Sequence, residues 1–151
     1  RGRGVPTIVD SRYSVRSFSG VDYVKQNDAE LAAAFERHLD TEDVLEEAAR
    51  ELIAELGAKG ALITRGEKGM MLFLADGARH EIPVSDKSEV YDVSGAGDTC
   101  VAAFILALAG GALPLAAAQL SNIASGIAVR KFGTATVSAA ELTRKVRELS
   151  V

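Results

Sequence analysis

The chain contains 151 residues, of which 48% are hydrophobic and 25% are charged, as is usual for a soluble globular protein. The formal net charge is -4 at pH 7, and the Lys and Arg residues are scattered, which argues against a nucleic acid or an anionic membrane as partner. The longest apolar run, residues 100–109, is too short to cross a bilayer, and the single cysteine excludes a disulfide framework, so we expect a reducing, cytoplasmic location.

The first predicted element is a strand at residues 5–10, which are apolar and rich in β-branched side chains. The Asp-Ser-Arg triplet at residues 10–12 would lie at its carboxyl end, where open α/β sheets bind ligands. A solvated pair of loop charges explains the triplet equally well. A second short strand is expected at residues 23–24.

A helix is predicted to begin after Asn27, because Asn is a good N-cap and Glu30 completes a capping box. Leu31, Phe35 and His38 recur at helical spacing and are expected on its inner face. The Asn-x-x-Glu pattern has two interpretations, a helix cap and a functional site, and spacing alone favours the cap.

A longer helix is predicted for residues 41–56, with an apolar stripe, a threonine N-cap and a glycine stop. Its Glu and Arg residues are interpreted as a solvated face. Strands at residues 61–64 and 70–74, and another near 81–84, should follow. The glycines between the first two suit a hairpin turn but could equally let backbone N–H groups approach a phosphate. That loop comprises Arg65, Gly66, Glu67, Lys68 and Gly69.

Residues 91–99, Tyr-Asp-Val-Ser-Gly-Ala-Gly-Asp-Thr, predict an extended segment, a glycine turn and the start of an apolar helix. The free N–H groups and positive dipole end of such a helix make the turn an anion site. Asp98 puts a carboxylate in the first helical turn. A phosphoryl-transfer enzyme needs both an anion cradle and a proton acceptor, so this combination favours that chemistry.

Three helices close the chain. The helix at residues 96–109 is apolar nearly all round and is expected to be buried. The next, residues 114–131, carries Asn122, either as a satisfied core group or as a polar contact in a ligand pocket. The last starts at residue 138 with a capping box. Strands alternating with helices, then helices alone, predict one α/β domain at 1–151, with a mostly parallel sheet and helices on both faces.

Residues 92–99 resemble the D-[TV]-[TS]-G-A-G-D-[TS] signature of the ribokinase-like (PfkB) carbohydrate kinases. The Asn-x-x-Glu at 27–30 resembles a motif of that family, and residues 64–69 resemble its nucleotide-phosphate loop. Residues 89–99, 64–70 and 131–138 look like its heptose-7-phosphate kinase branch. Asp-Ser-Arg in place of Asp-Pro-Lys, and Lys-Gln-Asn in place of Thr-Pro-Asn, depart from the family pattern and bear on the substrate.

The resemblance implies a three-layer α/β/α fold and ATP-dependent phosphorylation of a sugar or sugar-phosphate hydroxyl, as in a D-glycero-D-manno-heptose 7-phosphate 1-kinase. Asp98 would be the general base, and the N–H groups of Gly95, Ala96 and Gly97 would hold the charge of the transferring phosphoryl group. Asn27 and Glu30 would orient Mg²⁺ through water. The nucleotide, ATP or ADP, would be bound by Thr64, Arg65, Gly66, Glu67, Lys68, Gly69, Gly97 and Asn122.

Members of this family often use a monovalent cation such as K⁺ near the catalytic loop. The positions that match its ligands, mostly carbonyl donors, are Asp92, Ser94, Ala128, Lys131, Gly133 and Val137.

Family members are about twice as long, and the part that would precede residue 1 carries the sugar pocket and the lid. We therefore expect a C-terminal, nucleotide-binding part of a kinase, inactive by itself. Family members often dimerise through the lid, so a homodimer is expected of the full-length protein.

Three alternatives remain. One is a related kinase for ribose, fructose or a nucleoside, and another is a non-catalytic nucleotide-binding fragment. The third is a dinucleotide-binding oxidoreductase, which is disfavoured because Cys100 stands at the third glycine position of G-x-G-x-x-G and no early βαβ unit precedes it.

Overall fold

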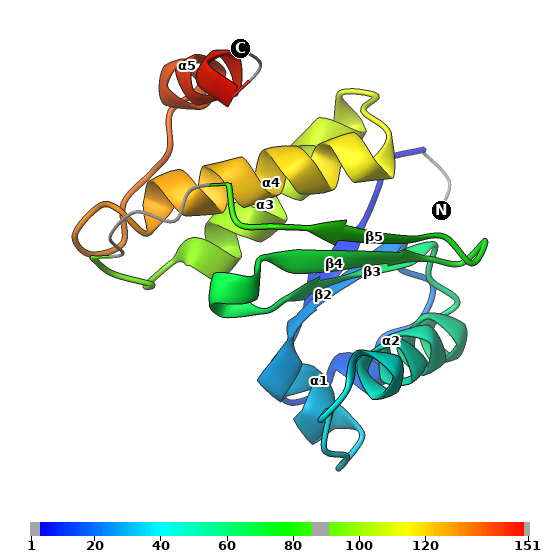
Figure 1. Cartoon of the computed structure of the whole chain (residues 1–151). Helices are drawn as coiled ribbons and strands as arrows, with labels where there is room; N and C mark the ends of the chain where they lie inside the picture. The colour runs from blue at the N-terminus through cyan, green and yellow to red at the C-terminus, as the bar shows by residue number, and fades with distance from the viewer. Residues whose placement is uncertain (1–3, 86–90, 150–151) are drawn as a thin grey trace. The chain divides into compact units, whose positions relative to one another are not determined.

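The computed structural model describes residues 4–85 and 91–149 (Figure 1). The chain divides into two compact units, Arg1–Glu81 and Ile82–Val151. Among the described residues, no helix combines the length and the apolar character needed to span a membrane.

A five-stranded sheet in the order β1-β2-β3-β4-β5 organises the first unit. β1 with β2 and β2 with β3 are parallel, whereas β3 with β4 is antiparallel. The sheet is therefore mixed, with the antiparallel pair at the predicted glycine hairpin. Its strands are β1 (Ile8–Asp10), β2 (Tyr23–Asn27), β3 (Gly60–Thr64), β4 (Met70–Leu74) and β5 (Arg79–Ile82).

Two helices, α1 (Asp28–Ala34) and α2 (Glu42–Leu56), pack on one face of this sheet (Figure 1). The caps of α2 are those expected, since Thr41 Oγ1 accepts a hydrogen bond from Val44 N at 3.3 Å and Gly57 takes the left-handed conformation, φ 61°. The core between helices and sheet consists of buried aliphatic and aromatic side chains, among them Leu31, Leu52, Leu56, Val24, Ile63 and Phe73.

The helix after Asn27 is shorter than the sequence predicts. α1 ends at Ala34, and Glu36 has φ 49°, which turns the chain out of the helix. Leu31 is buried as predicted, and Phe35 packs against the core, with the Arg16 guanidinium 4.7 Å from the centroid of its ring. His38 lies beyond the helix and is exposed, so the prediction of an inner position was wrong for His38 alone.

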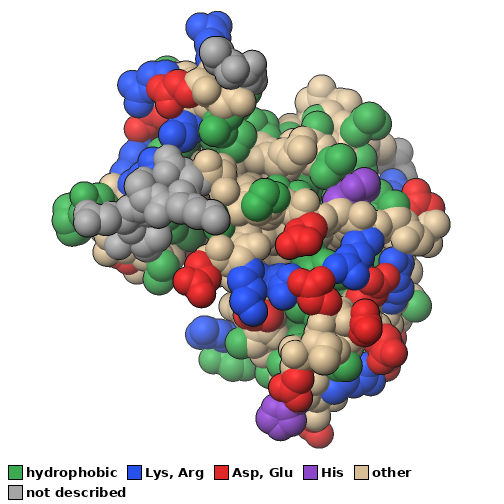
Figure 2. All heavy atoms as spheres, viewed as in Figure 1, with side chains coloured by type: hydrophobic (Ala, Val, Ile, Leu, Met, Phe, Trp, Pro, Cys, Tyr) green, Lys and Arg blue, Asp and Glu red, His purple; other side chains and the backbone are tan. Residues whose placement is uncertain are grey.

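The charged face of α2, predicted to be a solvated face, also forms salt bridges to other elements. Glu42 pairs with Arg65 at 3.1 Å and with Arg79 at 2.6 Å, and Glu46 pairs with Arg79 at 3.0 Å. These bonds lower the pKa of Glu42, through Arg65 first and Arg79 second. Figure 2 shows acidic and basic side chains interleaved over this region. Salt bridges therefore join α2 to β5 and to the β3–β4 loop.

The second unit contains α3 (Ala96–Ala109), α4 (Pro114–Ala128) and α5 (Ala139–Leu149). α4 ends three residues before the predicted Lys131. Small side chains such as Ala117, Ala118 and Ser121 are buried on α4, which lets α3 approach closely. No described residue of α5 is buried.

The expectation that α3 is buried all round was wrong. Cys100 and Phe104 are its buried side chains, whereas Leu106 is 71% exposed. Apolar residues occur on every side of α3, but within the described residues α4 packs against one side of it.

Candidate active site

In the first unit, the Asn-x-x-Glu motif forms the predicted capping box. Glu30 N donates to Asn27 Oδ1 at 2.7 Å, and Asn27 N donates to Glu30 Oε2 at 2.9 Å. Parallel pairing sets Asn27 beside Thr64, so the motif lies next to the start of the 65–69 loop. The cap is thus confirmed, and it brings two groups of candidate residues together at the carboxyl ends of β2 and β3.

These residues fit Mg²⁺ only through water. Asn27 Oδ1 and Glu30 Oε2 are both engaged in the cap, whereas the partner of Glu30 Oε1 within the described part of the chain is the Arg12 guanidinium, at 3.8 Å. A carboxylate oxygen with a spare lone pair suits an ion that keeps most of its own water ligands.

The 65–69 loop is a closed glycine turn. Arg65 N donates to Gly69 O at 2.8 Å, and Gly69 N donates to Gly66 O at 3.0 Å. Gly66 has φ 55°, and a Cβ there would meet nothing within 4 Å. Glycine is therefore required at position 66 by the backbone conformation, and the open space beside it would let a phosphate approach.

The loop side chains divide into two groups. The Arg65 guanidinium is 10% exposed and is held by Glu42 at 3.1 Å and by Met71 Sδ at 3.1 Å. Arg65 was predicted to bind the nucleotide, but in this structure its side chain stabilises the hairpin. Glu67 and Lys68 are exposed, so Lys68 is the cation of this loop that can reach a phosphate.

A partly buried ion pair between the end of β1 and the middle of β2 was missed from the sequence. Lys25 Nζ lies 3.0 Å from Asp10 Oδ2, and Lys25 is only 5% exposed. The neighbouring Gln26 is fully buried; its Nε2 donates to Ser11 O and Lys25 O, while its Oε1 has no hydrogen-bond partner. The register of the parallel pair explains the contact, because it sets Asp10, the last residue of β1, beside Lys25 of β2.

In the second unit, the helix start forms an open anion turn. Gly95 is the N-cap of α3, with φ 77° and no side-chain cap. Ala96 N donates to Val93 O at 3.2 Å, so of the three predicted charge-holding donors this one is already used. Among the described residues, Gly95 N and Gly97 N donate to no protein atom. Asp98 is exposed in the first turn, within reach of a ligand held there.

Asp92 joins this turn to the 131–137 loop. Its Oδ1 accepts from Ser94 N at 2.8 Å, and its Oδ2 accepts from Gly133 N at 3.0 Å. The hydrogen bonds from Ser94, and then that from Gly133, lower the pKa of Asp92 below its usual range. The carboxylate therefore stays ionised at the point where both loops meet.

The proposed cation ligands fit a monovalent ion in their chemistry. The ionised Asp92 supplies negative charge, while the Ala128 carbonyl accepts a single bond, from Lys131 N at 3.0 Å, and keeps a lone pair. The Lys131 ammonium is itself engaged, donating to Thr136 O at 2.7 Å. Asp92, Ser94, Ala128, Lys131 and Gly133 all belong to one unit.

Asn122 is a satisfied core group in this structure. It is 8% exposed, and its Nδ2 donates to Pro83 O at 2.7 Å. The sequence had left a core role and a ligand contact open, and the hydrogen bond accounts for the burial. A contact with adenine stays a prediction.

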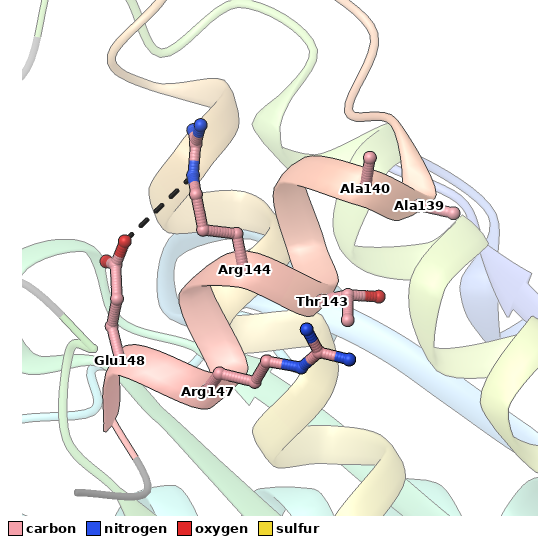
Figure 3. Close-up of a pocket in the computed structure, with 6 residues that line it drawn as sticks. All are labelled: Ala139, Ala140, Thr143, Arg144, Arg147 and Glu148. Carbon is pink, nitrogen blue, oxygen red and sulfur yellow. Dashed lines mark ion pairs between the residues drawn. The ribbon is translucent and has the colours of Figure 1, made fainter.

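A depression of about 520 Å³ runs along α5 and is lined by that helix alone (Figure 3). In the close-up, Arg144 and Glu148 form an ion pair on one flank, and Arg147 points away from it. None of its six lining residues belongs to the candidate active site. We therefore interpret it as surface relief of an exposed helix.

Comparison with known proteins places the chain in a family. A sequence profile described as "pfkB family carbohydrate kinase" matches residues 3–141. The chain belongs to the pfkB family of carbohydrate kinases. The glycine turn before α3 and the Asn-x-x-Glu cap of this pfkB chain thus lie within the matched region.

Curated relatives of this pfkB chain are bifunctional proteins. It is 40% identical to the bifunctional protein HldE of Coxiella burnetii over 151 residues, which cover 99% of the chain and 31% of that protein. It is 41% identical to HldE of Rhodospirillum rubrum over 152 residues, covering all of the chain and 30% of that protein. The chain thus spans about a third of the length of these relatives.

Solved structures establish the fold of this pfkB chain. Escherichia coli phosphofructokinase-2 in complex with potassium matches with a TM-score of 0.85 and 25% identity, over 99% of the chain and 49% of that protein. Arabidopsis thaliana ribokinase complexed with ribose and ATP matches with a TM-score of 0.84 at 23% identity, over 95% of the chain and 48% of that protein. The fold is α/β and ribokinase-like.

Proposed function

We propose that the protein containing these residues is an ATP-dependent kinase of D-glycero-D-manno-heptose 7-phosphate that phosphorylates the 1-hydroxyl. The observation that carries the proposal is the start of α3, where the Gly95 and Gly97 N–H groups donate to no atom of the described residues and lie beside the exposed carboxylate of Asp98. Family membership supports the reaction, and about 40% identity to HldE proteins supports the heptose branch.

Asp98 accepts the proton of the attacking hydroxyl in this proposal. It has the exposure that contact with an acceptor requires, and it lies in the first turn of α3 beside the anion turn. The N–H groups of Gly95 and Gly97 stabilise the charge on the transferring phosphoryl group. Ala96 contributes mainly to the turn, because its N–H donates to Val93 O.

The nucleotide is assigned to the remaining candidates. The open turn at Gly66 and the exposed Lys68 would hold its phosphates, and Asn122 would lie near the adenine. Glu30 Oε1 would orient Mg²⁺ through water, and the Asp92 group would hold K⁺. These cations supply positive charge to the phosphates and to the anion turn. The crystal structure of phosphofructokinase-2 with potassium supports the second assignment by analogy.

A kinase for another sugar is the second candidate. The partly buried Lys25–Asp10 pair favours it, because Lys25 replaces the Thr of the usual family pattern. Purified full-length protein should be assayed with ATP against heptose 7-phosphate, fructose 6-phosphate, ribose and a nucleoside. A kcat/KM for heptose 7-phosphate below that of another sugar would refute the heptose assignment.

The base assignment is tested by Asp98→Asn in the full-length protein. We expect phosphorylation to fall at least about 10²-fold, with ADP affinity unchanged, because the amide keeps the shape but accepts no proton. Asp43→Asn is the matched control, since Asp43 is also an exposed acid in the first turn of a helix, α2. Near-normal turnover by Asp98→Asn, or an equal loss in the control, would show that Asp98 is not the base.

A further inference from the structure

A series of alternating charges connects the 65–69 loop to helix α2. Arg65 Nη1 lies 3.1 Å from Glu42 Oε1, and the other oxygen of the same carboxylate, Oε2, lies 2.6 Å from Arg79 Nη2. Arg79 also pairs with Glu46, one helical turn further along α2, at 3.0 Å. Glu42 is the first residue of α2, so its side chain joins the start of this helix both to the loop after β3 and to β5.

Arg65 is the residue through which these salt bridges reach the loop. Its backbone closes the turn, because Arg65 N donates to Gly69 O at 2.8 Å and Arg65 O accepts from Lys68 N at 3.1 Å. Its side chain is only 10% exposed, and it donates to Met71 Sδ at 3.1 Å as well as to Glu42. A thioether is a weak acceptor, so the carboxylate of Glu42 is the strong partner of this guanidinium.

The turn that Arg65 closes offers backbone donors to a ligand. Among the described residues, the N–H groups of Gly66 and Glu67 donate to no protein atom, and a Cβ at Gly66 would meet nothing within 4 Å. Successive N–H groups at a turn form an anion-binding concavity, and they bind more tightly when the turn is ordered in advance. Both groups directly follow Arg65, so a shift of Arg65 would displace them.

We propose that Glu42 is a positioning residue for the nucleotide phosphates, because it fixes the 65–69 loop through Arg65 while touching no phosphate itself. This inference rests on the proposed function, in which the loop holds the phosphates of ATP. Without the charge of Glu42, a nearly buried guanidinium would lose its carboxylate, which is costly, so Arg65 would turn toward solvent and loosen the loop. Ordering the loop would then cost free energy each time a nucleotide binds.

The test compares Glu42→Gln with Glu46→Gln. Both substitutions remove a carboxylate of α2 that pairs with Arg79, but of the two only Glu42 also pairs with Arg65. In the 151-residue chain without ligand, Glu42→Gln should speed hydrogen exchange of the amides that close the turn about tenfold, and Glu46→Gln should change it little. Those amides are Arg65, Lys68 and Gly69.

The affinity for ADP, measured by calorimetry, should follow the same order. Binding should weaken about tenfold in Glu42→Gln and stay nearly unchanged in Glu46→Gln. In the full-length protein, Glu42→Gln should raise KM for ATP about tenfold and leave kcat nearly unchanged. Equal effects of the two substitutions, or a fall in kcat alone, would overturn the positioning role.

Arg65→Gln separates positioning from direct contact. If Glu42 acts through Arg65, this substitution should weaken ADP binding as much as Glu42→Gln does, and the double variant should bind no more weakly than either single variant. If Arg65→Gln weakens binding and Glu42→Gln does not, Arg65 contacts the phosphates itself and the proposal is wrong.

Failure of the proposed function would give a different result. If the natural chain binds no ADP, the nucleotide assignment of the loop is wrong, and a positioning role for its phosphates fails with it. If the natural chain and Glu42→Gln bind ADP equally well, the nucleotide assignment stands and the role of Glu42 alone is refuted.

Discussion

Glu30 closes a helix cap and is proposed to orient Mg²⁺, and each role uses a different oxygen of its carboxylate. Oε2 accepts from Asn27 N at 2.9 Å and closes the capping box, whereas Oε1 lies 3.8 Å from Arg12 Nε. A cap needs an acceptor but no charge, since Gln serves at this position as well as Glu. Magnesium bound through water is favoured by the full carboxylate charge.

Substitutions at Glu30 should therefore separate the two roles. Glu30→Gln keeps the acceptor and should leave the free energy of unfolding within about 0.5 kcal/mol, while reducing the Mg²⁺ dependence of ADP binding. Glu30→Ala loses both and should cost about 1 kcal/mol in denaturant unfolding. If Glu30→Gln binds Mg-ADP as the natural protein does, the residue is a cap and nothing else.

At the scale of elements, α3 has two unlike faces. Phe104 is completely buried, and Leu106, two residues later, is 71% exposed. The helix is thus anchored by a few inward side chains near its middle, and its other apolar side chains add little to the stability of the chain.

Paired substitutions on α3 test this asymmetry. Phe104→Ala should lower the free energy of unfolding by about 3–5 kcal/mol, because it opens a cavity in a packed core. Leu106→Gln should change it by less than about 0.5 kcal/mol, as expected for an exposed position. Denaturant titration of both variants measures the difference, and equal losses would mean that Leu106 is buried in solution.

The Lys131–Glu141 ion pair is one of the contacts that hold α5. Hydrogen bonds from Lys131, and then from Ser138, lower the pKa of Glu141 to about 2, against a usual value of 4.5. A carboxyl group whose pKa is depressed on folding stabilises the fold above its unfolded pKa, and this contribution disappears as the pH falls toward the folded pKa.

Comparison with Glu141→Gln isolates that charge, because Gln can still close the capping box with Ser138. The natural chain should be more stable than the variant at pH 7, and the difference should shrink from about pH 4.5 downward and vanish near pH 2. Thermal unfolding of both across this range measures it. A difference that persists unchanged at pH 2 would exclude the ion pair as its source.

Local signals in the sequence predicted several helix caps and the limits of several elements. The caps of α2, the limits of β4 and α3, and the box at Asn27 follow from turn residues and periodicity within a few positions. Partners far apart in the chain could not be predicted in this way. Three features depend on which elements become neighbours: the Lys25–Asp10 pair, the Glu42–Arg65 salt bridge and the exposed side of α3.

At the scale of the whole molecule, the chain holds two groups of candidate residues, one in each compact unit. The nucleotide candidates around Gly66 belong to the first unit, and Asp98 with the anion turn belongs to the second. The chain covers 49% of phosphofructokinase-2 and 31% of the HldE protein of Coxiella burnetii.

The chain alone should bind ADP without transferring phosphate. Micromolar-to-millimolar ADP should raise its melting temperature through mass action, since ligand that binds only the folded state stabilises it. Incubation with ATP, Mg²⁺ and heptose 7-phosphate should yield no sugar bisphosphate above background. Robust turnover by these 151 residues would show that the complete active site is already present.

Because burial differs between β3 and α5, their amide protons should exchange with solvent at different rates. Ala61, Leu62 and Ile63 in β3 have no exposed surface and pair with strands on both sides, whereas no described residue of α5 is buried. Amide protons of β3 should exchange with solvent only when the first unit opens as a whole, while those of α5 exchange through local fraying. Hydrogen exchange should therefore rank the amides of β3 among the slowest and those of α5 among the fastest in the part of the chain that the structure describes.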